Sequence, residues 1–244
     1  MLEHLVIHPP LGFFIFDVWY FIFIGPALLL GMFAQWRVSS TFSSMSQIGA
    51  RMSGAEAARR MLDSGGLHNV GIEQVAGHLS DHYDPRAKVL RLSPQVYGGR
   101  SMAALGVACH EAGHAFQDAK GYAPLAIRNA AVPAANFGSG IGATMAAIGV
   151  MFSYSSPTIG NSLLLIGIVL FSCVVFFQVV NLPVEFNASS RARQHLVDAR
   201  MISPNEEQYV AKVLNAAALT YVAGTLQAIL TLAYYIFRLM NSRD

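Results

Sequence analysis

His110, Glu111 and His114 stand in a His-Glu-x-x-His pattern within residues 101–121, SMAALGVACHEAGHAFQDAKG. On a helix, positions i and i+4 share one face about 5–6 Å apart, so both imidazoles can reach one metal ion. Glu111 lies one step round the helix and can take a proton from a water molecule on that ion. The pattern therefore predicts metal-assisted hydrolysis.

The flanking residues predict the helix that this pattern requires. Ser101 is a suitable N-cap and Gly121 a suitable C-terminal stop. Between them, apolar residues recur at three-to-four spacing, as on the buried face of a helix. Small residues at 108, 112, 113 and 115 would let another element pack closely against it.

A catalytic zinc needs three protein ligands and a water, so a further ligand must come from elsewhere in the chain. A third histidine six residues after His114 is excluded, because Lys120 occupies that position. No carboxylate lies near Ala134, about twenty residues further on. Glu185 is the sole acidic residue in 119–197, which makes it the preferred third ligand. An acidic residue at the start of a helix can also be there only because its negative charge interacts favourably with the helix dipole.

Several other polar residues are candidates for contacting the substrate or supporting the metal ligands. His78 and His82 would lie on one face of a strand but about 13 Å apart, too far to bind one ion together. A place in a hairpin or beside the cleft suits them better. The candidates for substrate contact, oxyanion stabilisation or ligand support are His82, Tyr83, Arg193, His195 and Tyr221.

Composition indicates a membrane protein. Hydrophobic residues make up 54% of the 244 residues and charged residues 12%, against about 25% charged in soluble domains. The apolar residues gather in runs near the 20 or so that cross a bilayer. A net charge of +2, without a basic stripe, gives no support for nucleic-acid binding. Cys109 and Cys173 lie in apolar helical settings and cannot form a disulfide framework.

Four transmembrane spans are expected. Residues 1–12 read as an irregular lead-in, and the first apolar run reads as a retained anchor. Asp17 inside its first turn suggests that this span starts a little later than residue 13. Gly138, Gly142, Ala146 and Gly149 place small residues on a close-packing stripe of the second span. The expected spans are residues 13–36, 131–152, 162–183 and 216–239.

The polar region 37–128 is expected to hold a small sheet beside the metal-binding helix. Ser53 and Glu56 form a capping box at the start of a short amphipathic helix. Residues 70–75, 78–83 and 88–92 have strand patterns, with a turn at 84–87. An edge strand near 88–92 could pair with an extended peptide and hold it across the ion.

The distribution of basic residues predicts the orientation in the membrane. Ten of the sixteen Lys and Arg residues lie in 37–128 and four in 185–212. The positive-inside rule places both polar parts in the cytoplasm. Two crossings separate these parts, so they share one side, as a joint active site requires.

We therefore expect a mostly α membrane protein with about four transmembrane helices and a zincin-like cytoplasmic domain containing a small β-hairpin or sheet. The expected division is a lead-in and first span (1–36), a zincin-like domain (37–130), a transmembrane hairpin (131–184), a second cytoplasmic part with the third ligand (185–215) and the last span with the C-terminus (216–244).

The chain resembles the YugP-type neutral zinc metallopeptidases of bacterial membranes in three runs, GHLSDHYDPRAKVLRLSPQVYGGRSMAALGVACHEAGHAFQDAKGYAP, NLPVEFNASSRAR and VLNAAALTYVAGTL. The family is similar in logic to HtpX-type membrane proteases, in which a Glu at the start of a later helix completes the site (the gluzincin arrangement). The resemblance implies His110, His114 and Glu185 as ligands and Glu111 as base.

Two functions follow as expectations. The first is a zinc endopeptidase of the bacterial inner membrane, multi-pass, hydrolysing membrane or cytoplasmic proteins at the cytoplasmic face. The alternative is a metal-binding membrane scaffold or regulatory subunit with little proteolytic activity, acting through membrane protein partners or as a homo-oligomer. An intact Glu111 speaks against the second, because a structural zinc has no use for a base. Manganese or cobalt could also occupy two histidines and a carboxylate.

Overall fold

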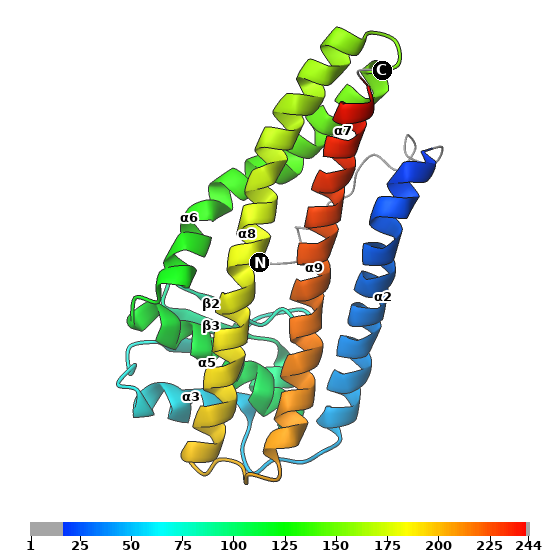
Figure 1. The fold of residues 1–244 in the computed structure, drawn as a ribbon. Helices are drawn as coiled ribbons and strands as arrows, with labels where there is room; N and C mark the ends of the chain where they lie inside the picture. Colours follow the sequence, from blue (N-terminus) through cyan, green and yellow to red (C-terminus); the bar gives the residue numbers. More distant parts are fainter. Residues whose placement is uncertain (1–16, 243–244) are drawn as a thin grey trace. The chain divides into compact units, whose positions relative to one another are not determined.

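The computed structural model describes residues 17–242. The expected lead-in at 1–12 and the expected start of the first span at residue 13 lie outside the described residues. In chain order the elements are α2 (Val18–Ser46), α3 (Gly54–Ser64), β1 (Gly71–Gln74), β2 (His82–Asp84), β3 (Val89–Leu92), α4 (Pro94–Tyr97), α5 (Met102–Ala119), α6 (Ala123–Phe137), the π-helical turn η1 (Gly138–Gly142), α7 (Ala143–Phe152), α8 (Pro157–Asp198) and α9 (Glu207–Asn241) (Figure 1).

The chain folds into two compact units, each assembled from separate segments. Unit 1 comprises residues 34–126 and 183–220, and unit 2 comprises 127–182 with the described parts of 2–33 and 221–244. Because α2, α8 and α9 each continue from one unit into the other, both units are built from parts of the same long helices.

Unit 1 contains a three-stranded sheet whose central strand is β3. β1 pairs with β3 in parallel, and β2 pairs with β3 antiparallel, with Tyr83 opposite Leu90. The expected hairpin is therefore confirmed, but the expectation of an edge strand near 88–92 is wrong, because both sides of β3 are paired. The strand expected over 78–83 is reduced to β2, since Gly77 (φ 116°) and Leu79 (φ 54°) adopt left-handed conformations before it.

The helices of unit 1 start at the predicted caps and bury one apolar face. Ser53 and Glu56 form the expected capping box of α3. Ser101 caps α5 by accepting a hydrogen bond from the Ala104 amide. Met61, Leu62 and Leu105 are fully or almost fully buried in a common core with Leu90. The core therefore joins α3, α5 and the sheet, which fixes the position of the metal-binding pattern.

Helix α8 runs unbroken through 42 residues, including Pro183 and Glu185. The expectation of a separate helix beginning at Glu185 is therefore wrong. The end of the third span near Pro183 stays a prediction. A proline inside a helix removes one backbone hydrogen bond. Continuation is favoured here because Val184, Ala188 and Ala192, spaced four apart, are fully buried in unit 1. Glu185 is thus held inside a long helix.

In unit 2, η1 and α7 pack against the first part of α8 through small residues. A Cβ at Gly138 would lie 2.3 Å from the Leu170 carbonyl oxygen, and one at Gly149 would lie 2.4 Å from the Leu164 amide nitrogen. Such close approach of backbones confirms the predicted small-residue stripe. The expected second span over 131–152 begins earlier, at Ala123, and contains the π-helical turn.

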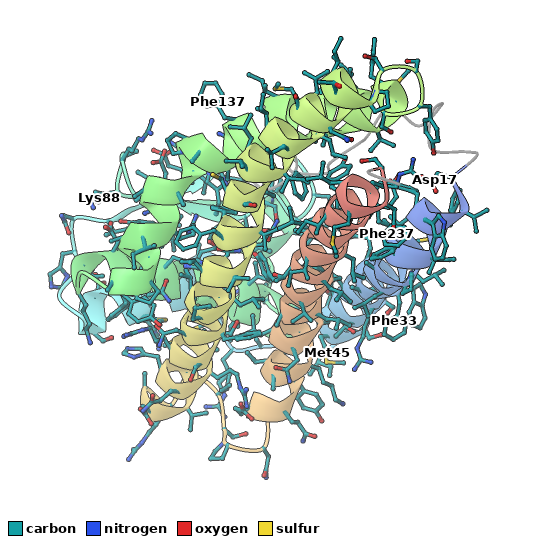
Figure 2. All side chains as sticks on the ribbon, turned by 45° about the horizontal axis from the view of Figure 1, so that its top comes forward. Asp17, Phe33, Met45, Lys88, Phe137 and Phe237 are labelled. Carbon is teal, nitrogen blue, oxygen red and sulfur yellow. The ribbon has the colours of Figure 1, made fainter. Side chains whose placement is uncertain are left out.

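Four helices among residues 17–242 are long and apolar enough to cross a membrane: α2, the segment Ala123–Phe152, α8 and α9. Large apolar side chains on them face outward, among them Phe33 and Phe137, 45% and 62% exposed (Figure 2). Helix α2 starts at Val18, as Asp17 indicated, and Asp17 Oδ1 accepts a hydrogen bond from the Trp19 amide 3.0 Å away.

Candidate metal centre

His110 and His114 lie one turn apart on α5, and both are buried with Glu111 between them. Their exposed fractions are 9% for His110, 7% for His114 and 9% for Glu111. The two imidazole rings stand nearly perpendicular, with centroids 4.8 Å apart. Helical i, i+4 spacing accounts for their shared face, and the enclosing core removes them from bulk water.

Glu185 reaches the two histidines from α8. Its Oε2 lies 3.2 Å from His110 Nε2 and 3.5 Å from His114 Nε2, and its exposed fraction is 3%. One potential ligand atom from each of the three residues lies within 4.8 Å of the others. Two imidazole nitrogens and a carboxylate oxygen form the donor set of many catalytic zinc sites. These residues therefore fit zinc.

Hydrogen bonds on the far side of each imidazole favour Nε2 as the metal-binding atom. His114 Nδ1 lies 3.0 Å from Gln117 Oε1, and the Gln117 amide nitrogen donates to the Val184 carbonyl (2.8 Å) and Asn187 Oδ1 (3.0 Å). Because Gln117 Oε1 can only accept, His114 Nδ1 carries the proton and Nε2 keeps its lone pair.

His110 has an equivalent partner on α8. Its Nδ1 lies 3.1 Å from Ser189 Oγ, on the face opposite the Nε2 that approaches Glu185. The Ser189 hydroxyl can accept the Nδ1 proton of His110, which would leave the Nε2 lone pair for a metal. Two imidazole nitrogens and a carboxylate oxygen would then converge in a buried space, which is an arrangement that a cation stabilises. Sequence reasoning missed Gln117 and Ser189. Their spacing was the available signal, since Gln117 follows His114 by three positions and Ser189 follows Glu185 by four.

Glu111 is held beside the metal ligands by the edge strand β2. The Tyr83 amide nitrogen donates to Glu111 Oε2 over 3.0 Å. Burial raises the pKa of Glu111 to about 7, with the charge of His110 acting against the rise and the charge of Glu185 adding to it. One carboxylate oxygen of Glu111 is therefore held by the backbone amide of Tyr83. Glu111 is not one of the three candidate metal ligands.

Two predicted residues lie on β2, but their side chains have other partners. The Tyr83 hydroxyl donates to Asp118 Oδ2 over 2.7 Å, and the same oxygen accepts from Lys88 Nζ over 2.5 Å. His82 Nδ1 lies 2.8 Å from the Ser80 carbonyl oxygen. Tyr83 thus contacts Glu111 through its backbone amide, and its phenol connects the sheet to the end of α5 by a hydrogen bond to Asp118.

The structure does not gather the other predicted residues into the three-ligand group. Arg193 forms an ion pair with Glu207, and His195 Nε2 lies 2.5 Å from Ser64 Oγ on α3. Tyr221 is part of α9 in unit 2. His195 follows Glu185 by ten positions on one continuous helix, so it lies about 15 Å further along the axis.

Comparison with known proteins agrees with this donor set. The family described as "Putative neutral zinc metallopeptidase" matches residues 20–240. A curated relative, "Putative membrane protease YugP" of Bacillus subtilis (strain 168), is 48% identical over 227 residues, which cover 92% of this chain and 98% of the relative. No solved structure matches the chain. The chain belongs to this family of neutral zinc metallopeptidases, and zinc is its cofactor.

Proposed function

We propose that the chain is a membrane-embedded zinc endopeptidase in which His110, His114 and Glu185 hold the metal and Glu111 is the general base, the gluzincin arrangement of a His-Glu-x-x-His helix. The observation that carries the proposal is the convergence of the three donor atoms within 4.8 Å, with a second buried carboxyl, that of Glu111, beside them. Zinc bound there would polarise a peptide carbonyl and lower the pKa of a water molecule.

Glu111 performs the proton transfers of the proposed reaction. The Tyr83 amide fixes its Oε2 (3.0 Å), while the helix places its carboxyl next to the ligands. It accepts a proton from the attacking water and passes it to the nitrogen of the leaving amine. Burial of the carboxyl excludes competing bulk water from this exchange.

The edge strand β2 offers a place for the peptide substrate. β3 occupies one side of β2, and the Tyr83 amide points from the other side to Glu111. No described strand pairs with β2 on that side, so an extended peptide lying along it would lie beside the base while the Tyr83 amide stays bonded to Glu111. We therefore assign substrate alignment to β2 instead of residues 88–92.

The membrane supplies the setting of the proposed activity. Four helices are long and apolar enough to span it, and the relative is named a membrane protease. The concentration of Lys and Arg in 37–128 and 185–212 supports a multi-pass protein of the bacterial inner membrane with its active site in the cytoplasm. Its substrates would then be membrane or cytoplasmic proteins.

Glu111→Gln tests the proposal against a metal-binding scaffold of little activity. Gln keeps an oxygen that can accept from the Tyr83 amide but cannot take a proton, so proteolysis should fall at least about a hundredfold, as for loss of a general base. Zinc content should remain that of the wild type. The measurements are fluorogenic casein hydrolysis and metal analysis of detergent-purified protein.

His195→Gln is the matched control, because this half-buried residue lies outside the three-ligand group. It should retain both zinc and activity. Undiminished proteolysis by the Glu111→Gln protein would refute the base. A wild-type protein that binds zinc and cleaves neither casein nor proteins of its own membranes would favour the scaffold.

A further inference from the structure

An open cavity of about 640 Å³ in unit 1 is lined by five arginines, Arg51, Arg59, Arg60, Arg100 and Arg200, together with Glu56. They come from the segment after α2, from α3, from the residue before the α5 cap, and from the turn between α8 and α9. None of them is a metal ligand or contacts Glu111 in the proposed site.

Two of the arginines form fixed walls of the cavity. Arg59 donates to the carbonyl oxygens of Val70 (2.6 Å) and Leu67 (2.8 Å). Arg100 donates to the carbonyl oxygen of Arg51 (3.2 Å). Arg59 also pairs with Asp63 (2.8 Å) and Arg100 with Glu56 (3.1 Å). Their guanidinium groups are therefore already held in place and need no ligand to order them.

The side chains of the other three arginines, Arg51, Arg60 and Arg200, are exposed, and their guanidinium groups make no hydrogen bond or ion pair with any residue in 17–242. Even with Glu56, Asp63 and Glu206 counted as neighbouring acids, the cavity keeps a formal surplus of two positive charges. An arginine just after the C-terminal end of a helix is often explained by the helix dipole, which can account for Arg200 after α8. The dipole does not account for Arg51, which lies two residues before the N-cap of α3, where a cation is disfavoured. It cannot account for Arg60, in the middle of α3.

Arg200 also adopts a backbone conformation that glycine would favour. Its φ is 52°, in the left-handed region, just after the end of α8. A residue with a side chain at such a position carries a conformational cost of about 1 kcal/mol. The long cationic side chain at this position is therefore consistent with a role for the charge itself.

We propose that this cavity binds a phosphate-bearing anion with at least two negative charges. The planar fork of arginine matches phosphate oxygens in bidentate geometry, and the volume falls in the range of small-molecule sites. No aromatic ring is among the lining residues, so the cavity has no stacking surface for a nucleobase. Recognition is thus directed at the phosphate groups. Their source is a soluble polyphosphate-type anion or the phosphorylated headgroup of a lipid.

Inorganic pyrophosphate is the probe for the soluble source, titrated calorimetrically into the zinc-loaded full chain in a neutral detergent. Arg60→Ala and Arg200→Gly should each weaken binding at least about tenfold. Both should fold normally, because Ala is the best helix former and Gly adopts positive φ without strain. Arg86→Ala, which removes an exposed arginine from the β2–β3 turn, should bind as the wild type does.

Chelation of the zinc by pyrophosphate would be the same in all these proteins, so the arginine-dependent part of the affinity reports the cavity. For the lipid source, the melting temperature is compared in nanodiscs of phosphatidylcholine with and without phosphatidic acid. A rise with phosphatidic acid that Arg60→Ala and Arg200→Gly abolish, without binding of free pyrophosphate, assigns the site to a headgroup.

Three results would overturn the proposal. The first is no arginine-dependent effect with either probe. The second is an equal loss in Arg86→Ala, which would indicate a general charge effect. The third is tighter binding of a polyglutamate peptide of the same charge, which would make the cavity a site for acidic peptides.

Discussion

Gly113 of α5 faces the backbone of Ala188 on α8 so closely that a Cβ at position 113 would lie 2.7 Å from the Ala188 carbonyl oxygen. This approach brings Glu185, three residues before Ala188, to the histidines that flank Gly113. The separation of the two helices is therefore part of the metal site's geometry.

Gly113→Ala should disturb the metal site without removing a ligand. Overpacking of a buried contact costs about 1–3 kcal/mol, and here the relief of the clash moves α8 and its carboxylate away from α5. We expect weaker zinc binding in competition with a chelator and a lower melting temperature. Gly31→Ala, where no atom lies within 4 Å of the added Cβ, is the control and should neither weaken zinc binding nor lower the melting temperature. Wild-type zinc affinity in Gly113→Ala would contradict this role of the contact.

Gln117→Leu should weaken zinc binding although Gln117 is not a ligand. The fully buried amide orients the His114 ring and connects α5 to the Val184 carbonyl. Loss of a partner behind a metal-binding histidine lowers affinity about 10–100-fold. Chelator competition measures the effect, and Gln208→Leu, an exposed glutamine on α9, provides the comparison. Unchanged affinity would show that the ring needs no such partner.

Glu185→Gln should lose more zinc affinity than Gln117→Leu does. The change removes the negative charge between two imidazoles 3.2 and 3.5 Å from Oε2, so the loss should exceed the roughly hundredfold limit for supporting residues. Removing zinc from the wild type with a chelator should abolish proteolysis, and added zinc should restore it. The same treatment should not restore Glu185→Gln at equal zinc concentration. Full zinc occupancy in this variant would exclude Glu185 as the third ligand.

Asp81→Asn should stabilise the protein at neutral pH. Burial raises the pKa of Asp81, while hydrogen bonds from Ser93 act against the rise. Between the ordinary value near 3.9 and the raised value, the unfolded chain loses its proton first, so rising pH lowers folded-state stability. The melting temperatures of the variant and the wild type in detergent should therefore coincide at low pH. As the pH rises through this interval, the melting temperature of the wild type should fall below that of the variant. A difference in melting temperature between the two proteins that stays constant with pH would contradict the raised pKa of Asp81.

Asp84→Asn should show the opposite pH dependence. Hydrogen bonding to Arg91 lowers the pKa of Asp84 to about 2. The stability that this carboxylate contributes is present above about pH 3.9 and is lost as pH falls towards 2. The variant should melt below the wild type at neutral pH, and the difference should close in acid. The gap should be small, because solvent screens this partly exposed pair.

The sequence by itself determined the local features. The i, i+4 histidines, the Ser53 and Ser101 caps and the small-residue stripe at 138–149 depend on neighbours within a few positions, so spacing alone reveals them. Glu185 could be selected because it is the sole acid in 119–197. The zinc cofactor followed from the chemistry of these residue types.

Tertiary structure decided the features that depend on packing between distant segments. Pro183 predicted a helix end, yet burial of Val184, Ala188 and Ala192 favours an unbroken α8. The strand pattern at 88–92 could not show that β1 would pair on one side and β2 on the other. Gln117 and Ser189 acquire their roles because α5 and α8 approach closely at Gly113. Local spacing fixes which side chains share a face, whereas contacts between helices far apart in sequence fix which faces meet.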